Sequence, residues 1–269
     1  MASQTSSSKN SDIKLKAISL NVRGLRNNKK RKTLFHKFKK NDYDIVCLQE
    51  TYLLKNDINL IKKDWGSLFH IVEGTKRSKG LLTLFNSKFK DSNIAIIKEN
   101  ERCLISEITI DDMNFTLLNV YAPCINTEKN TFFRNIANFV NELQQNPASN
   151  LLIFGDFNTV LNNQLDIISG ENHNVNIVNS FNNLVNDLFV VDIWRHLHGN
   201  KKEFSWNKEK PFIARRLDYI LVSEDLLPFC KDSNIVELGF SAIIRQSPFT
   251  LIFHRLREVP PFLSLMFPY

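Results

Sequence analysis

Polar side chains that could do hydrolytic chemistry stand at the ends of several apolar runs. Gly155-Asp156-Phe157-Asn158 directly follows the apolar run 151–154. A buried strand that ends in this glycine turn would bring Asp156 and Asn158 to a sheet edge, where α/β folds gather their catalytic groups. The turn alone is weakly diagnostic, because Gly, Asp and Asn also form ordinary turns. Its weight comes from four polar residues that close other apolar runs: Asn21, Glu50, Tyr121 and Asp218.

Two of these residues fit a metal site. Asn21 and Glu50 would offer hard oxygen ligands suited to Mg²⁺, with Mn²⁺ as a second candidate. A cation held there could polarise a phosphoryl oxygen and stabilise a leaving oxyanion. The chemistry expected from these ligands is hydrolysis of a phosphodiester or phosphomonoester.

The other four residues fit the roles that remain in such a hydrolysis. Asp156 could orient or deprotonate the attacking water, and Asn158 and Tyr121 could donate hydrogen bonds to the transition state. Asp218 could hold the metal or position another residue. No arrangement of Cys, Ser or His nucleophiles competes with direct attack by water.

Each residue taken singly also has a structural explanation. The order and number of the residues favour the active-site interpretation over a chance collection of such features. The structural alternatives are solvated strand ends at Asn21 and Glu50, an edge aromatic at Tyr121, turn formers at Asp156 and Asn158, and an ion pair of Asp218 with Arg215 or Arg216.

The elements that must position these residues form a mixed pattern. Apolar residues at three- and four-residue spacings predict helices over Lys29–Lys40, Thr127–Gln145 and Ile177–Leu188. A hairpin turn is expected at Asp111-Asp112-Met113-Asn114. This mixture of hairpins and strand–helix–strand crossings favours a four-layered α/β sandwich of two mixed sheets flanked by helices. The predicted strands are Lys14–Asn21, Asp44–Gln49, Ser67–Val72, Gly80–Phe85, Asn93–Lys98, Arg102–Ile110, Asn114–Val120, Asn150–Phe154, Arg216–Val222 and Phe249–Phe253.

Composition sets the broad class of protein. The 269 residues suit one domain over 13–254, with a disordered lead at 1–12 and an irregular, proline-containing tail at 255–269. Lys and Arg outnumber Asp and Glu by 35 to 28, and a pI near 9.2 suits a polyanionic partner. The four cysteines lack C-x-x-C spacing and indicate free thiols in a reducing compartment. No signal sequence or membrane span is evident, so we expect a nuclear or cytoplasmic monomer.

The motifs together resemble those of the endonuclease/exonuclease/phosphatase superfamily, which includes apurinic endonucleases and DNase I. The residues of these motifs are most similar to those of the endonuclease domain of LINE-type retrotransposon polyproteins. The resemblance spans about Lys14 to Phe253 and rests on S-L-N-V-R-G-L-R, C-L-Q-E-T, L-N-V-Y-A-P, L-I-F-G-D-F-N and R-R-L-D-Y-I-L-V-S. It implies a DNase I-like fold and Mg²⁺-dependent nicking of target DNA to prime reverse transcription.

Carried over by motif, the resemblance implies a role for each residue. It gives a metal-site Asn and Glu, a phosphate-contacting Tyr, a water-activating Asp, a transition-state Asn and a supporting late Asp. In that order these are Asn21, Glu50, Tyr121, Asp156, Asn158 and Asp218.

One motif of the family is missing from this chain. The superfamily closes its site with Ser-Asp-His-x-Pro, and its His contacts the scissile phosphate. Here Ile244-Arg245-Gln246 precedes Ser247-Pro248. Gln246 has no proton that ionises near neutrality, and loss of a positioned acid or base costs on the order of 10²–10⁴ in rate. We therefore expect weak or absent nicking with nucleic-acid binding retained.

Basic residues supply the expected nucleic-acid contacts. The densest cluster, within Lys29–Lys40, fits a solvated helix face or a phosphate-contacting surface. Trp206 could stack on a sugar or base, or pack in the core. The residues predicted to contact DNA are Arg23, Lys76, Arg77, Lys79, Arg215 and Arg216.

Three alternatives to a retrotransposon endonuclease stay open. One is a stand-alone apurinic or DNase-like nuclease, and another is a catalytically dead remnant that only binds nucleic acid. The third is a phosphatase acting on a small substrate, which the basic pI disfavours.

Overall fold

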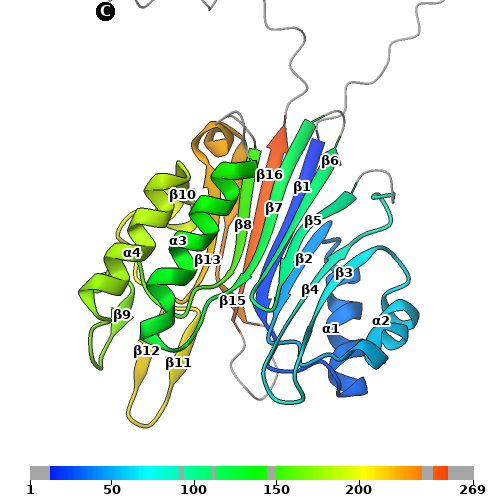
Figure 1. Cartoon of the computed structure of the whole chain (residues 1–269), viewed down its shortest axis with the longest axis horizontal. Coiled ribbons are helices and arrows are strands. Elements are labelled where there is room, and N and C mark those ends of the chain that lie inside the picture. Colours follow the sequence, from blue (N-terminus) through cyan, green and yellow to red (C-terminus); the bar gives the residue numbers. More distant parts are fainter. Residues whose placement is uncertain (1–12, 91–93, 111–112, 144–149, 238–244, 254–269) are drawn as a thin grey trace, which may run out of the picture.

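Two β-sheets pack face to face, and helices cover their outer surfaces (Figure 1). The computed structural model describes residues 13–90, 94–110, 113–143, 150–237 and 245–253. This arrangement confirms the predicted four-layered α/β sandwich. The predicted lead and tail, 1–12 and 255–269, and the turn residues Asp111 and Asp112 lie outside the described residues.

The first sheet has seven strands and is mixed. Only β1 and β2 pair in parallel, and the other neighbours are antiparallel. Six strands follow one another in the order β14 (Cys230–Ser233), β16 (Arg245–Phe253), β1 (Ile13–Asn21), β2 (Ile45–Gln49), β4 (Lys79–Phe85) and β3 (Phe69–Gly74), and β15 (Val236–Glu237) pairs with β16.

The second sheet has six strands, and its one parallel pair is β7 with β8. Its order is β10 (Val190–Asp192), β13 (Asp218–Ser223), β8 (Asn150–Asp156), β7 (Met113–Tyr121), β6 (Cys103–Ile110) and β5 (Ile94–Asn100). A small third sheet projects from the lower edge in Figure 1 and consists of β11 (Trp206–Lys208), β12 (Ile213–Arg215) and β9 (Ile167–Ile168).

The helices lie outside the two sheets. The three predicted helices are confirmed as α1 (Asn28–Lys40), α3 (Asn126–Leu143) and α4 (Val175–Asp187). The sequence reading missed α2 (Ile58–Trp65), α5 (Ile193–His198) and two 3₁₀ segments, Lys55–Asp57 and Glu224–Phe229. Among the described helices, none combines the length and the apolar character needed to cross a bilayer.

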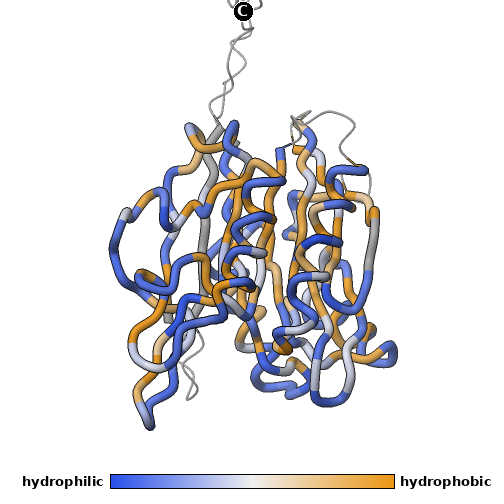
Figure 2. The backbone as a smooth tube through the Cα atoms, turned by 60° about the vertical axis from the view of Figure 1, so that its left-hand side comes forward, coloured by the Kyte–Doolittle hydropathy of each residue, from blue (hydrophilic) through white to orange (hydrophobic). Residues whose placement is uncertain are grey.

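Alternation along the strands builds three apolar layers. Successive strand side chains point to opposite faces, so Ala17 and Cys47 face the second sheet while Ile18 and Val46 pack under α1 and α2. A third layer joins the outer face of the second sheet to α3 and α4. The strands of both sheets are accordingly apolar along most of their length (Figure 2). These layers fix the sheets against each other and hence the strand ends that carry the polar residues.

Candidate active site

The ends of the central strands bring the predicted residues together at one edge of the sandwich. The parallel pairing of β1 and β2 sets Asn21 beside Gln49, one residue before Glu50. In the second sheet Asp156 pairs with Tyr121 on one side and with Asp218 on the other.

A single amide group links the two sheets at this edge. Nδ2 of Asn21 donates to Oε1 of Glu50 at 2.7 Å and to Oδ2 of Asp156 at 2.8 Å. Oε2 of Glu50 accepts a third hydrogen bond, from the hydroxyl of Tyr52 at 2.5 Å. Two carboxylates from different sheets therefore share one donor and lie close to each other.

Burial makes this carboxylate pair electrostatically costly. Asp156 is 6% exposed, and its desolvation, with the charge of Glu50, raises its pKa to about 6. Burial and the charge of Asp156 also raise the pKa of Asp218 well above its usual range, and its Oδ1 has no partner among the described residues. A cation between the carboxylates would relieve this repulsion.

The donor set fits a hard divalent cation. Glu50, Asp156 and the amide oxygen of Asn21 are oxygen ligands, which Mg²⁺ or Mn²⁺ accepts alongside waters. Within the described residues, no group of three or more His, Cys, Asp or Glu side chains is placed to hold a metal. Two carboxylates with an amide oxygen suit a partly hydrated magnesium ion.

Asn158 is held in place by its own backbone and by α3. It adopts a left-handed φ of 49°, which Asn tolerates, and its N–H donates to Oδ1 of Asp156 at 2.9 Å. Its Nδ2 donates to the carbonyl of Ala122 at 2.8 Å, and its own carbonyl accepts from Nζ of Lys129 at 2.6 Å. One Nδ2 proton stays available for a substrate oxygen.

Tyr121 and Asp218 lie behind the residues that face the cavity. Tyr121 is 6% exposed, and its hydroxyl is 3.7 Å from Sγ of Cys124. Burial raises its pKa, so the hydroxyl stays a donor at neutral pH. The backbone N–H of Asp218 donates to Oγ of Ser205 at 3.0 Å. Both side chains can support the site without opening into the cavity.

The cavity in front of these residues has a volume of about 430 Å³. Four of the six predicted residues line it, together with two of the predicted DNA contacts and several side chains that the sequence reading passed over. The predicted lining residues are Asn21, Glu50, Asp156, Asn158, Arg23 and Arg215, and Trp206 joins them; the others include Cys124, Lys129 and His173. Cys124 is exposed, and all four cysteines are free thiols.

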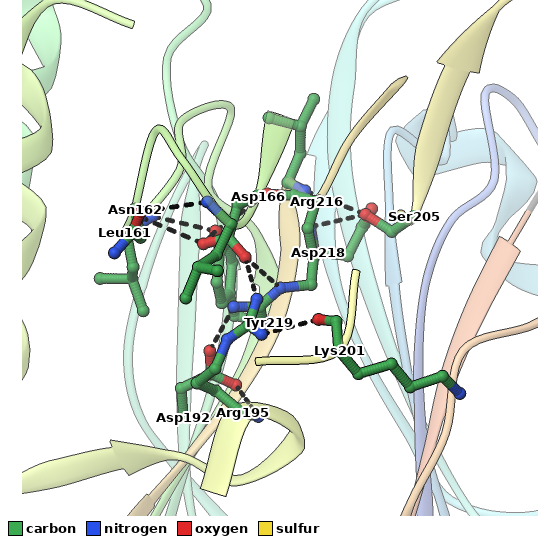
Figure 3. A network of polar contacts seen from close by, with 12 residues as sticks. Leu161, Asn162, Asp166, Asp192, Arg195, Lys201, Ser205, Arg216, Asp218 and Tyr219 are labelled. Atoms are coloured by element: carbon green, nitrogen blue, oxygen red, sulfur yellow. Dashed lines mark hydrogen bonds and ion pairs between the residues drawn. The ribbon is translucent and has the colours of Figure 1, made fainter. Parts of the chain in front are cut away.

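Arg216 was predicted to contact DNA, but the structure places it in the interior (Figure 3). It is 1% exposed, and its guanidinium donates to Asp166 at 2.9 Å and to Asp192 at 2.6 Å. A guanidinium buried between two carboxylates cannot reach a phosphate. The same pairing excludes an ion pair between Arg216 and Asp218.

Three further predicted DNA contacts, Lys76, Arg77 and Lys79, lie outside the cavity. Lys76 and Arg77 are exposed on the turn between β3 and β4, and this turn is closed by a 2.7 Å hydrogen bond from Thr75 N–H to Ser78 O. Lys79 forms an ion pair with Glu101 at 2.6 Å. This turn stays a predicted contact surface separate from the cavity.

Two motif residues link the two sheets beneath the site, although no role was predicted for them from the sequence. Nε2 of Gln49 donates to Oδ1 of Asn119 at 2.8 Å, and both side chains are fully buried. Nδ2 of Asn119 reaches the carbonyls of Leu48 and Leu82 and the hydroxyl of Thr83. The feature of the sequence that could have indicated this role is their position in the motifs Q-E-T and L-N-V-Y-A-P.

Several residues with a left-handed backbone conformation lie around the site. Arg23, Glu50 and Tyr52 have φ values of 46°, 51° and 56°. Such conformations cost roughly 1–3 kcal/mol each and persist where surrounding contacts impose them. Here the N–H of Gly24 donates to the carbonyl of Glu50 at 2.6 Å, which ties the loops after β1 and β2 together.

Strand β16 begins at the same edge. Ser247 pairs with Ser19, so Gln246 and Arg245 continue the strand toward the end of β1 at Asn21. Arg245 and Gln246 therefore lie on the strand that pairs with β1, which ends at Asn21. Ile244 and His254 lie outside the described residues.

Fold and site together define a DNase I-like α/β sandwich with acidic residues gathered at its strand ends. The chain belongs to the endonuclease/exonuclease/phosphatase family, whose profile matches residues 18–247. Among curated proteins it is similar to the transposon TX1 uncharacterized 149 kDa protein of Xenopus laevis, with 25% identity over 228 residues. That match covers 82% of this chain and 17% of the relative, so the chain spans about a sixth of the relative's length.

Two solved AP endonucleases share the fold. LMAP from Leishmania major superposes with a TM-score of 0.75 at 17% identity, over 88% of this chain and 87% of that chain. The enzyme from Archaeoglobus fulgidus gives a TM-score of 0.69 at 19% identity, over 89% of this chain and 99% of that chain.

Proposed function

We propose that this chain is the endonuclease domain of a LINE-type retrotransposon, built to nick DNA with a divalent cation and weakened in its hydrolytic step. The observation that carries the proposal is the Asn21 amide, which holds the carboxylates of Glu50 and Asp156 together across the two sheets. The similarity to a transposon protein supports the retrotransposon assignment. The basic pI supports a polyanionic substrate.

The metal would be held by Asn21 and Glu50. Bound Mg²⁺ supplies charge stabilisation at the phosphoryl oxygen and at the leaving oxygen. Asn21 donates its two Nδ2 protons to the two carboxylates. Within the described residues, its Oδ1 accepts only a 3.2 Å hydrogen bond from the N–H of Arg23. The amide is thereby oriented with its oxygen available as a ligand.

Proton handling falls to Asp156. Its carboxylate is buried, and the N–H of Asn158 and Nδ2 of Asn21 fix its two oxygens. A carboxyl whose pKa is raised toward neutrality is a better base than an ordinary Asp, so Asp156 can accept a proton from the attacking water. Nδ2 of Asn158 faces the cavity and is a donor for the charged oxygens that develop.

Arg245 and Gln246 limit the reaction. They stand where the family pattern has Asp and His, and β16 leads them toward the carboxylate cluster. Gln246 cannot carry a proton, and a cation at Arg245 would compete with the metal for Glu50. The alternative of a catalytically dead, DNA-binding remnant rests on the same two residues.

Nicking of supercoiled plasmid by the purified chain tests the proposal. We expect slow Mg²⁺-dependent nicking that EDTA stops and that Asp156→Asn abolishes, with duplex binding retained in all cases. Nicking as fast as that of an intact family enzyme would refute the impaired step. Activity equal to that of Asp156→Asn, with binding retained, would establish the remnant instead.

A further inference from the structure

The cavity is also lined by three nitrogen-bearing side chains that the proposed hydrolysis does not use. Lys129 comes from α3, His173 from the segment before α4, and Arg215 from the end of β12. The positive charges of Arg215 and Lys129 both help to lower the pKa of His173, so the three side chains are neighbours. They form the basic wall of the cavity, a name used below for these three residues.

Lys129 is a buried side chain that pairs with no carboxylate in the part of the chain that the structure describes. It is 3% exposed, and Nζ donates to the carbonyl of Asn158 at 2.6 Å and to Oδ1 of Asn126 at 3.1 Å. Neither Lys129 nor Arg215 forms an ion pair with a carboxylate of the described residues. Burying an unpaired cation is costly, so such a group commonly meets an anion when the site is in use.

The other two side chains each keep an unused nitrogen. Nη2 of Arg215 donates to the carbonyl of Glu171 at 3.1 Å, while its Nε is buried and has no partner among the described residues. His173 contacts Thr159 Oγ1 through Nδ1 at 3.1 Å, and its buried Nε2 has no partner there either. The backbone of His173 is fixed by two 3.0 Å hydrogen bonds with the side chain of Asn163.

The nitrogens without a partner and the cations without an ion pair indicate that the basic wall binds an anion. A lysine, an arginine and a neutral imidazole favour an anion with several acceptor oxygens, and a phosphate diester presents them. Glu171 is exposed at the edge of the same cavity and lowers the net charge of this wall to about one positive unit. The basic wall therefore suits a singly charged diester.

We propose that Lys129, His173 and Arg215 bind a second backbone phosphate of the nucleic acid, one that is not cleaved. The inference rests on the proposed function and deepens it. A substrate that fills both parts of the cavity must carry at least two phosphates in one strand. The site then requires a polynucleotide and rejects a small phosphomonoester.

Salt dependence of DNA binding tests this subsite without any cleavage. Anisotropy of a labelled short duplex is measured in EDTA over a series of NaCl concentrations for the wild type and for Arg215→Gln. Each lost phosphate contact lowers the slope of log K against log salt by about 0.9. We expect Arg215→Gln to bind more weakly with a slope smaller by about 0.9, and Arg215→Lys to keep the wild-type slope.

Two controls separate this subsite from general charge effects. Lys63→Gln removes the same charge from an exposed site on α2 and should leave the slope unchanged. His173→Asn should weaken binding without changing the slope, because the neutral imidazole contributes a hydrogen bond and no charge. An unchanged slope for Arg215→Gln, or an equal loss for Lys63→Gln, overturns the subsite alone. A wild type that does not bind duplex DNA at any salt concentration contradicts the proposed function itself.

Discussion

At the scale of single residues, few hydrogen-bond donors contact the carboxylates of the site. Asn21 satisfies one oxygen of Glu50 and one of Asp156, and Tyr52 satisfies the second oxygen of Glu50. An amide at position 21 thus does two things that a carboxylate cannot do. It donates to both neighbours, and it keeps the local negative charge low enough for the fold to tolerate.

Asn21→Asp should make the fold depend on a divalent cation. The substitution replaces a shared donor with a third carboxylate, so the free energy of unfolding should fall by about 1–3 kcal/mol in EDTA. Mg²⁺ should then raise the melting temperature more than it does in the wild type, because it binds only the folded state. Thermal unfolding with and without Mg²⁺ measures both effects. Asn138→Asp on the exposed face of α3 is the control, and equal Mg²⁺ responses in both variants would contradict the prediction.

His173 should make the protein lose stability in mild acid. Burial and the charges of Arg215 and Lys129 lower its pKa from 6.5 to about 4. Between these pH values the unfolded chain binds a proton that the folded chain does not bind. The free energy of unfolding therefore falls as the pH drops from 6.5 to 4, by on the order of 1–3 kcal/mol from this residue.

Urea unfolding from pH 7 to pH 4.5 checks the prediction for His173. His173→Gln should lose less stability than the wild type across this range, while His36→Gln, at an exposed position on α1, should follow the wild type. Parallel pH profiles for the wild type and His173→Gln would show that the imidazole is not held neutral by its neighbours.

At the scale of elements, close contact between parallel strands sets the position of the turn that carries Asp156 and Asn158. Gly155 lies in β8 beside Val120 of β7, and a Cβ at this position would stand 2.1 Å from the Val120 carbonyl oxygen. The glycine is therefore required for strand contact and not for a left-handed turn. Asp156 follows directly, so any shift of β8 displaces its carboxylate.

Gly155→Ala should weaken both the fold and the site. Forcing a methyl group against a strand carbonyl costs about 1–3 kcal/mol or more, because the two strands must separate. Urea unfolding measures the loss. Gly66→Ala is the matched control, because Gly66 caps α2 at a φ of 79° with open space around its Cβ position. The strand-contact explanation fails if Gly155→Ala is no less stable than Gly66→Ala.

Elements with a long apolar pattern were predictable, and short ones were not. Each of the ten predicted strands overlaps an observed strand, because Ile, Val, Leu and Phe runs bury on both faces of these sheets. Helix α2 is only eight residues long, and β9 to β12 have two or three residues each, too few for a period to show. These short elements carry Arg215 and Trp206, so no helix or strand pattern indicated where these two cavity residues would lie.

Residue roles that depend on contacts across the chain were the hardest to predict. The motif R-R-L-D places Arg215 and Arg216 side by side, yet Arg215 lines the cavity and Arg216 is buried against Asp166 and Asp192. Neighbouring side chains of a strand point to opposite faces, but which of the two arginines is buried becomes clear only when Asp166 and Asp192 are known as partners. Lys129 lies in an amphipathic helix that the sequence predicts, but its burial against Asn158 depends on a contact 29 residues away.

At the scale of the whole molecule, the chain keeps the framework of its family while one strand end departs from the family pattern. Both sheets, the inter-sheet bond between Gln49 and Asn119, and the carboxylate cluster are in place. The main departure lies at the start of β16, where Arg245 and Gln246 stand. Because the framework is in place over the described residues, we predict that substitutions at these two positions alone raise the nicking rate.

Arg245→Asp combined with Gln246→His should raise the rate of plasmid nicking by on the order of 10²–10⁴-fold, the usual contribution of one positioned acid or base. The pair removes a competing cation from the cluster and supplies an imidazole that the Asp can orient. Adding Asp156→Asn to the repaired chain must abolish the gain, which shows that the restored reaction uses the same site. Circular dichroism and duplex binding should stay at wild-type levels, because β16 pairs with β1 through its backbone. If the repaired chain nicks no faster than the wild type while still binding DNA, the impairment does not lie in β16.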